Sequence, residues 1–116
     1  MSYLHQEMAS GKWVTLSFLE QMAHIGSEVF RALSWKSRNE QYSVKASDRA
    51  LELLSLTLDD ARHTLKLREL ARLYEVMADY FYFDNTYGSS EKLWNSYFFP
   101  FTYAASLERE RRNATS

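Results

Sequence analysis

The chain has 116 residues, of which 46% are hydrophobic and 25% are charged, and its net charge at pH 7 is -1. This length suits one globular domain, and a charge so close to zero gives no electrostatic reason to expect a nucleic-acid partner. The sequence contains no cysteine, which excludes disulfides, thiolate metal sites and cysteine nucleophiles.

The N-terminal sequence gives no sign of export or membrane insertion. The first sixteen residues lack a basic segment followed by a continuous apolar run, and no apolar stretch approaches the ~20 residues of a membrane-spanning helix. We therefore expect a cytoplasmic protein that makes no contact with a membrane. It should be one domain over residues 1–116, with an N-terminal arm at 1–16 and a polar C-terminal end at 107–116.

The first half of the sequence predicts two helices. The first runs from about 18 to 36, because Ser17 and Glu20 form a capping box ahead of an apolar stripe. The second covers about 40 to 58, where apolar residues recur at helical spacing on more than one side. Both helices should therefore be contacted by neighbours.

The second half predicts two more helices. Asp59 and Asp60 suit the start of a third helix, which we expect from the early sixties to about 82. The fourth runs from about 91 to 111 and should be kinked at Pro100, which lacks an amide hydrogen. Short connections favour antiparallel neighbours, so the fold class is all-α: an antiparallel four-helix bundle with up-down-up-down order.

Gly26 lies inside the apolar stripe of the first helix. Glycine costs about 1 kcal/mol of helix propensity relative to alanine, so a close helix crossing is the expected compensation. The small residues Ala46 and Ala50 of the second helix are the expected partners.

Arg49 is unusual because it sits at the edge of the apolar arc of the second helix. An arginine buried there needs a carboxylate partner, and the candidates are Glu28, Glu75 and Asp79. We interpret this set as an internal structural ion pair. The alternative is a small enzyme or ligand-binding bundle that uses the same four residues as a polar site.

Two clusters hold residue types that bind metals. Asp60 and His63 lie three residues apart at the expected start of the third helix, which we interpret as capping. Glu20, His24 and Glu28 share one side of the first helix, but that side is the polar one. We therefore expect no metal and no cofactor.

Aromatic residues are concentrated in the last third of the sequence. Twelve of the 18 fall between positions 74 and 103. Those at positions 80 to 83 surround the end of the third helix on every side. One bundle interior cannot cover all of them, and such residues are enriched in protein interfaces. The leading hypothesis is a non-enzymatic protein that forms a homodimer or binds another protein. The candidate interface consists of Tyr82, Phe83, Trp94, Phe98 and Phe99.

A weaker alternative is an RNA-associated protein. Its phosphate contacts would come from basic residues of the third helical segment, namely Arg62, Lys66, Arg68 and Arg72. The charges closest to the aromatic segment are acidic, so nucleic acid is not the expected partner.

Four short strings carry a resemblance to a known family: residues 25–29 (IGSEV), 49–54 (RALELL), 68–70 (REL) and 87–89 (YGS). Over about residues 13 to 105, the chain resembles a family of small uncharacterised prokaryotic all-helical proteins. That resemblance implies a compact helical domain and carries no activity, cofactor, partner or residue role.

Overall fold

The computed structural model describes residues 11–115 and contains the four helices expected from the sequence. The all-α, four-helix prediction is therefore confirmed. Residues 1–10 of the expected N-terminal arm lie outside the described residues. The elements in chain order are η2 (Trp13–Thr15), α1 (Phe18–Trp35), α2 (Glu40–Leu58), η3 (Ala61–Lys66), α3 (Leu67–Tyr82) and α4 (Glu91–Thr115), where η marks a 3-10 helix.

Three of the helices begin at a residue whose side chain satisfies the first turn. Ser17, Asn39 and Ser90 each accept a hydrogen bond from the backbone amide three residues further on, at 3.2, 3.1 and 3.2 Å. These bonds satisfy amides that have no partner inside the helix, which fixes where each helix starts.

The start of the third helix differs from the prediction. The α-helical turns begin only at Leu67, and the segment before them is the 3-10 helix η3. The break lies at His63, whose backbone angles (φ -106°, ψ 25°) are not helical. The two aspartates expected to cap this helix do not cap α3 itself, which begins after Lys66 without a side-chain cap. Asp60 caps η3 instead, because its carboxylate accepts a hydrogen bond from the Arg62 amide at 3.0 Å.

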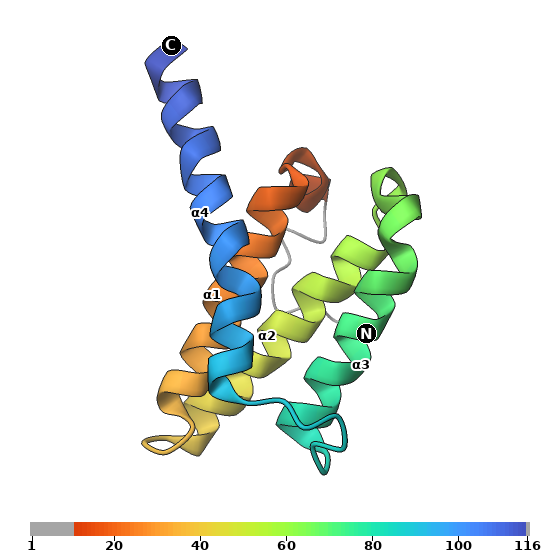
Figure 1. Ribbon diagram of the computed structural model, residues 1–116, viewed down its shortest axis with the longest axis vertical. Coiled ribbons are helices and arrows are strands. Elements are labelled where there is room, and N and C mark those ends of the chain that lie inside the picture. The colour runs from red at the N-terminus through yellow and green to blue at the C-terminus, as the bar shows by residue number, and fades with distance from the viewer. Residues whose placement is uncertain (1–10, 116) are drawn as a thin grey trace.

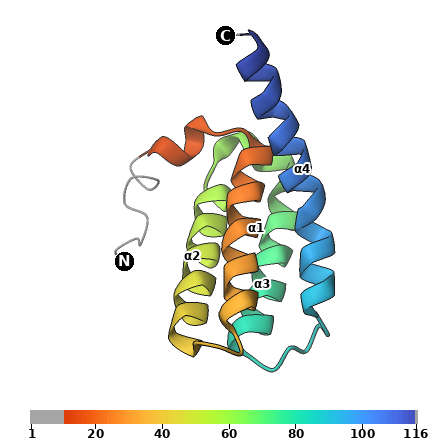
Figure 2. The ribbon, with the colours of Figure 1, turned by 90° about the vertical axis from the view of Figure 1, so that its left-hand side faces the viewer.

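The helices form a bundle (Figure 1), in which α1 packs against both α2 and α4. Figure 2 shows α1 between α2 and α4, while α3 packs mainly on α2. The α1–α2 and α3–α4 connections lie at one end of the bundle, and the α2–α3 connection lies at the other. The last turns of α4 project beyond the start of α1, so this end of the helix has few neighbours.

The core lies between α1 and its neighbours, and every helix contributes to it. Its buried members include Trp13, Met22, Ile25, Val29, Ala50, Leu53, Leu54, Leu70, Met77, Trp94 and Phe98.

Gly26 does mark a close helix crossing, but the partner predicted for it is wrong. A Cβ atom placed on Gly26 would lie 2.9 Å from three carbons of the Phe98 side chain, so the facing residue is on α4. The expected partners Ala46 and Ala50 belong to α2. Helix α1 packs against both α2 and α4. Gly26 faces α4, where the absence of a side chain leaves room for the Phe98 ring.

The fourth helix is longer than expected. It continues from Glu91 through Pro100 to Thr115, where the sequence suggested an end near Arg111. Its buried residues, Trp94, Phe98 and Ala105, all face the bundle. The kink at Pro100 stays a prediction.

Candidate functional site

The four residues of the expected polar site occupy two separate places. Glu28 of α1 is buried and lies between two arginines: its Oε1 is 3.0 Å from Arg31 Nη1, and its Oε2 is 3.9 Å from Arg49 Nη1. Arg49 does face an acidic residue of another helix, but its side chain is 38% exposed. The pair is therefore a half-exposed ion pair at the α1–α2 contact.

Asp79 and Glu75 lie on α3, and both bind the turn that follows it. The Asp79 carboxylate accepts hydrogen bonds from the backbone amides of Thr86 and Tyr87, at 2.9 and 3.0 Å. Glu75 accepts a long one, 3.4 Å, from the Tyr87 hydroxyl. Both carboxylates thus hold the α3–α4 turn in place, and no common site with Arg49 results.

The basic residues of the RNA hypothesis are largely engaged within the chain. Arg62 binds the Asp60 carboxylate, Lys66 lies 4.3 Å from the centroid of the Phe18 ring, and Arg72 lies over the ring of Tyr87. Arg68 is exposed, as are the other three, so the RNA hypothesis stays a prediction.

The structure contains a buried polar cluster that the sequence analysis interpreted only as capping. Gln21 of α1 lies at its centre: its amide nitrogen donates to the Trp13 carbonyl at 3.0 Å and to the Asp60 carboxylate at 3.1 Å. Its amide oxygen lies 2.7 Å from Nε2 of His63. Since an amide oxygen only accepts, His63 donates to it through Nε2. We call this set, together with Arg62 and Thr57, the polar corner.

The polar corner ties four elements together, namely η2, α1, α2 and η3. Thr57 of α2 accepts a hydrogen bond from the Trp13 indole at 3.0 Å, which fixes η2 against the bundle. Arg62 binds the Asp60 carboxylate at 2.7 Å and donates to the Leu16 carbonyl at 2.8 Å. These contacts hold the N-terminal segment against the α2–α3 junction.

Burial and the hydrogen bonds and charges within the polar corner shift the pKa values of Asp60 and His63. The hydrogen bond from Arg62 holds the pKa of Asp60 far below its ordinary value, although burial alone would raise it. Burial lowers the pKa of His63, and the nearby charges of Arg62 and Lys66 add to the effect while Asp60 opposes it. The surroundings of the corner therefore favour the ionised form of Asp60 and the neutral form of His63.

One signal in the sequence points to this cluster. Gln21 lies four residues before Ile25, on the apolar side of α1, and a polar residue in that position needs a buried partner. The residues that supply the partners come from positions far apart in the chain, so spacing alone does not identify them. Among the described residues, no group of three metal-ligating side chains is placed to hold an ion.

The five residues of the expected interface divide into three groups. Trp94 and Phe98 are buried within the bundle, so their assignment to an exposed interface is wrong. Tyr82 directs its hydroxyl to Asp48 and Ser47 of α2. Phe83 and Phe99 are 74% and 68% exposed and remain available to a partner.

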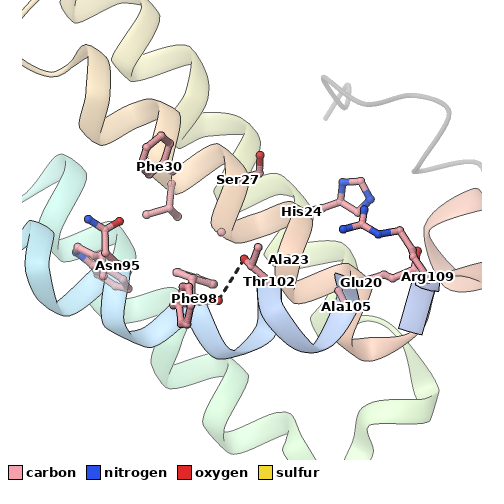
Figure 3. Close-up of a pocket in the computed structure, with 14 residues that line it drawn as sticks. Glu20, Ala23, His24, Ser27, Phe30, Asn95, Phe98, Thr102, Ala105 and Arg109 are labelled. Atoms are coloured by element: carbon pink, nitrogen blue, oxygen red, sulfur yellow. Dashed lines mark hydrogen bonds between the residues drawn. The ribbon is translucent and has the colours of Figure 1, made fainter. Parts of the chain in front are cut away.

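A groove of about 540 Å³ runs between α1 and α4, on either side of the crossing at Gly26 (Figure 3). One end carries polar side chains, where Glu20, His24 and Arg109 gather. The other end carries Phe30, which is exposed like Phe99. The groove is thus open, partly aromatic and bordered by charge at one end.

A second, smaller groove of about 340 Å³ separates α3 from α4. Leu73 and Val76 line it from α3, and Leu93 and Tyr97 line it from α4. Burial raises the pKa of the Tyr97 hydroxyl, and the Glu69 carboxylate across the groove adds to this effect. The two helices meet instead at the end nearest their connection, through rings of Tyr80, Phe81 and Trp94.

Comparison of the chain with protein-family models, curated proteins and solved structures gives no match. Within residues 11–115, no helix combines the length and the apolar character that crossing a membrane would require.

Proposed function

We propose that this protein is a non-enzymatic helical module of the cytoplasm that acts by binding protein, in the first place a second copy of itself. The observation that carries the proposal is the exposure of α4. This helix buries only three residues, yet large apolar side chains remain exposed on its other sides. They are Leu93, Tyr97, Phe99, Tyr103 and Leu107.

Exposed apolar side chains gathered on one element favour a binding surface. On α4, Phe99 and Tyr103 stack with ring centroids 6.3 Å apart, so they form one patch rather than scattered residues. An interface core rich in aromatic residues is typical of protein association.

The enzymatic alternative has weaker support. It requires Glu28, Arg49, Glu75 and Asp79 to converge, and they lie in two places with structural partners. The polar corner contains an acid and a histidine, but both are buried and bonded to other groups of the chain.

Sedimentation equilibrium tests the proposal directly. We expect the wild-type chain to exceed its monomer mass of 13.7 kDa at micromolar concentration. Tyr97→Glu and Leu107→Glu should each weaken the association, because an interface would have to desolvate the new carboxylate.

Gln41→Glu provides the matched control, since it adds the same charge at an exposed position on α2. It should leave the association unchanged. A wild-type chain that stays monomeric up to high micromolar concentration would rule out the homodimer and leave only a different protein as the partner.

A further inference from the structure

Helix α4 packs on α1 through a regular line of residues. Members of this line follow one another at intervals of four, three, four, three and four, the spacing with which one helix packs along another. Its apolar members are buried or half-buried, and its last two bind the start of α1: Glu108 accepts from Ser17 at 2.7 Å and Arg112 lies 2.8 Å from Glu20. The line consists of Trp94, Phe98, Phe101, Ala105, Glu108 and Arg112.

A second line with the same spacing begins one residue earlier, so it lies about 100° around α4 from the line that contacts α1. It consists of Leu93, Tyr97, Pro100, Ala104, Leu107 and Arg111, and we call it the outer seam. Five of its six members are exposed, and Ala104 is half-buried. The outer seam thus has the pattern of a packed helix surface but no helix on it among the described residues.

The structure leaves space beside this line. Leu93 and Tyr97 of the outer seam line the groove between α3 and α4, so a further helix can enter there and contact both. An amphipathic helix that lays its apolar side into such a groove is a common mode of protein recognition.

We infer that the occupant is α4 of a second copy, running antiparallel along the outer seam about a two-fold axis. The inference rests on the proposed self-association and specifies its surface. The residue spacing of the outer seam is four, three, four, three and four when counted from either end. An antiparallel copy can therefore place one of its six seam residues opposite each seam residue of the first. Leu93 then faces Arg111 of the other copy, Tyr97 faces Leu107, and Pro100 faces Ala104. Such mutual matching is what a two-fold interface requires.

Charges beside the outer seam favour the antiparallel direction. Lys92 and Glu110 are 18 residues apart, about five helical turns, so they lie on one line along the same edge of the seam. Both are exposed, and neither has an ion-pair partner within the described part of the chain. Antiparallel copies bring the same edge of both helices together, so Lys92 of one copy lies near Glu110 of the other. Parallel copies place this edge of the two helices on opposite sides of the interface, where Lys92 and Glu110 do not meet.

Cysteine cross-linking tests this arrangement, because the chain contains no cysteine of its own. The two variants are Leu93→Cys and Arg111→Cys, both at exposed positions. In the antiparallel dimer the cysteine at position 93 of one copy faces the cysteine at position 111 of the other, while two identical cysteines lie about 27 Å apart along the helix. A disulfide needs Cα atoms within about 7 Å. We therefore expect a mixture of the two variants, under mild oxidation, to form a covalent dimer, and either variant alone to form little.

Each other outcome contradicts the inference in a distinguishable way. Strong cross-linking of Leu93→Cys with itself would indicate a parallel pair. A dimer in sedimentation that none of these cysteines cross-links would place the interface elsewhere, for example at the groove between α1 and α4, and would leave the proposed function intact. A monomer in sedimentation would overturn both proposals.

A charge exchange provides a second measurement that leaves the apolar residues unchanged. Lys92→Glu places two carboxylates near each other at both ends of the antiparallel pair and should raise the dimer dissociation constant severalfold. Lys92→Glu combined with Glu110→Lys should restore it to near the wild-type value. A double variant as weak as the single one would contradict the antiparallel contact.

Discussion

The polar corner and helix α4 show opposite departures from the rule that polar groups face water and apolar groups face the core. At the polar corner, Gln21, Asp60 and His63 are each no more than 5% exposed. On α4, Leu93 and Phe99 are each more than half exposed. The two departures need different explanations.

Buried polar groups are stable where each finds a partner inside the chain. The amide and carboxylate groups of the corner bind one another or the backbone, so that region is complete by itself. Exposed apolar groups have no equivalent solution within the chain, because only another surface can cover them. The comparison therefore predicts that substitutions at the corner change the stability of the monomer, and that substitutions on the outer seam change association.

The largest effect should come from Asp60→Ala. Removing this carboxylate takes one acceptor from the Arg62 guanidinium, one from the Gln21 amide and the only side-chain cap from the Arg62 backbone amide. The Arg62 side chain is 48% exposed, so its charge stays in contact with water, and the cost comes from the lost cap of η3 and the lost acceptor for the buried Gln21 amide, together about 3 kcal/mol. Urea denaturation should show a loss of this size in the free energy of unfolding.

Asp59→Ala is the matched control, because Asp59 is exposed and directly precedes Asp60. It removes a carboxylate from the C-terminal end of α2, where the helix dipole disfavours negative charge, so stability should hold or rise slightly. Equal losses in the two variants would show that the corner has no special role.

The crossing of α1 and α4 gives the next largest effect. Gly26→Leu should destabilise the fold by about 1 to 3 kcal/mol, although leucine is the better helix former, because its Cβ would meet Phe98 at 2.9 Å. Thermal denaturation measures the loss. In a Phe98→Ala background the same change at Gly26 should cost less, and an equal cost in both backgrounds would contradict the contact.

Sequence reasoning succeeded where the information is local. Capping at Ser17, the apolar stripe of α1 and the break before Ser90 each depend on residues within a few positions of one another. It was wrong where two distant segments meet. Gly26 was correctly associated with a close approach, but its partner Phe98 lies 72 positions later, and the periodicity of either helix does not reveal which neighbour lies on which side.

The candidate sites illustrate the same limit. Helical spacing placed Phe99 on an exposed side, but it could not show that Trp94 and Phe98 form the side that α1 covers. Of the three candidate partners of Arg49, Glu28 does face it, but Asp79 is used by the α3–α4 turn instead. A turn whose amides need an acceptor competes for any nearby carboxylate, and this competition appears only once the fold is known.

A moderate effect is expected from pH. Burial lowers the pKa of His63 in the folded state, so below its ordinary pKa of about 6.5 the unfolded chain binds more protons than the folded one. Stability should therefore fall as the pH drops through this range, until His63 is protonated in the folded state too. Asp60 does not contribute there, because its pKa is already lowered and it stays ionised.

Urea denaturation at pH 7.5 and at pH 5 measures this dependence. His63→Gln keeps a side chain that can donate to Gln21 but removes the titration, so the loss of stability between the two pH values should be smaller than in the wild type. His24→Gln is the control, since His24 is exposed and lies outside the polar corner. A wild-type loss that His63→Gln leaves unchanged would assign the pH dependence to other groups.

The smallest effect on the monomer should come from Leu93→Ala. Leu93 is 58% exposed, so its truncation should change the free energy of unfolding by less than about 0.5 kcal/mol when the protein is dilute. Leu70→Ala is the matched control, because Leu70 is 2% exposed and its truncation should cost about 2 to 5 kcal/mol.

At higher protein concentration the expected effect of Leu93→Ala changes. A dimer stabilises the folded state by mass action, so the melting temperature of the wild type should rise with protein concentration, and Leu93→Ala should reduce that rise. A melting temperature that is independent of concentration in both proteins would mean that a second copy does not cover the outer seam.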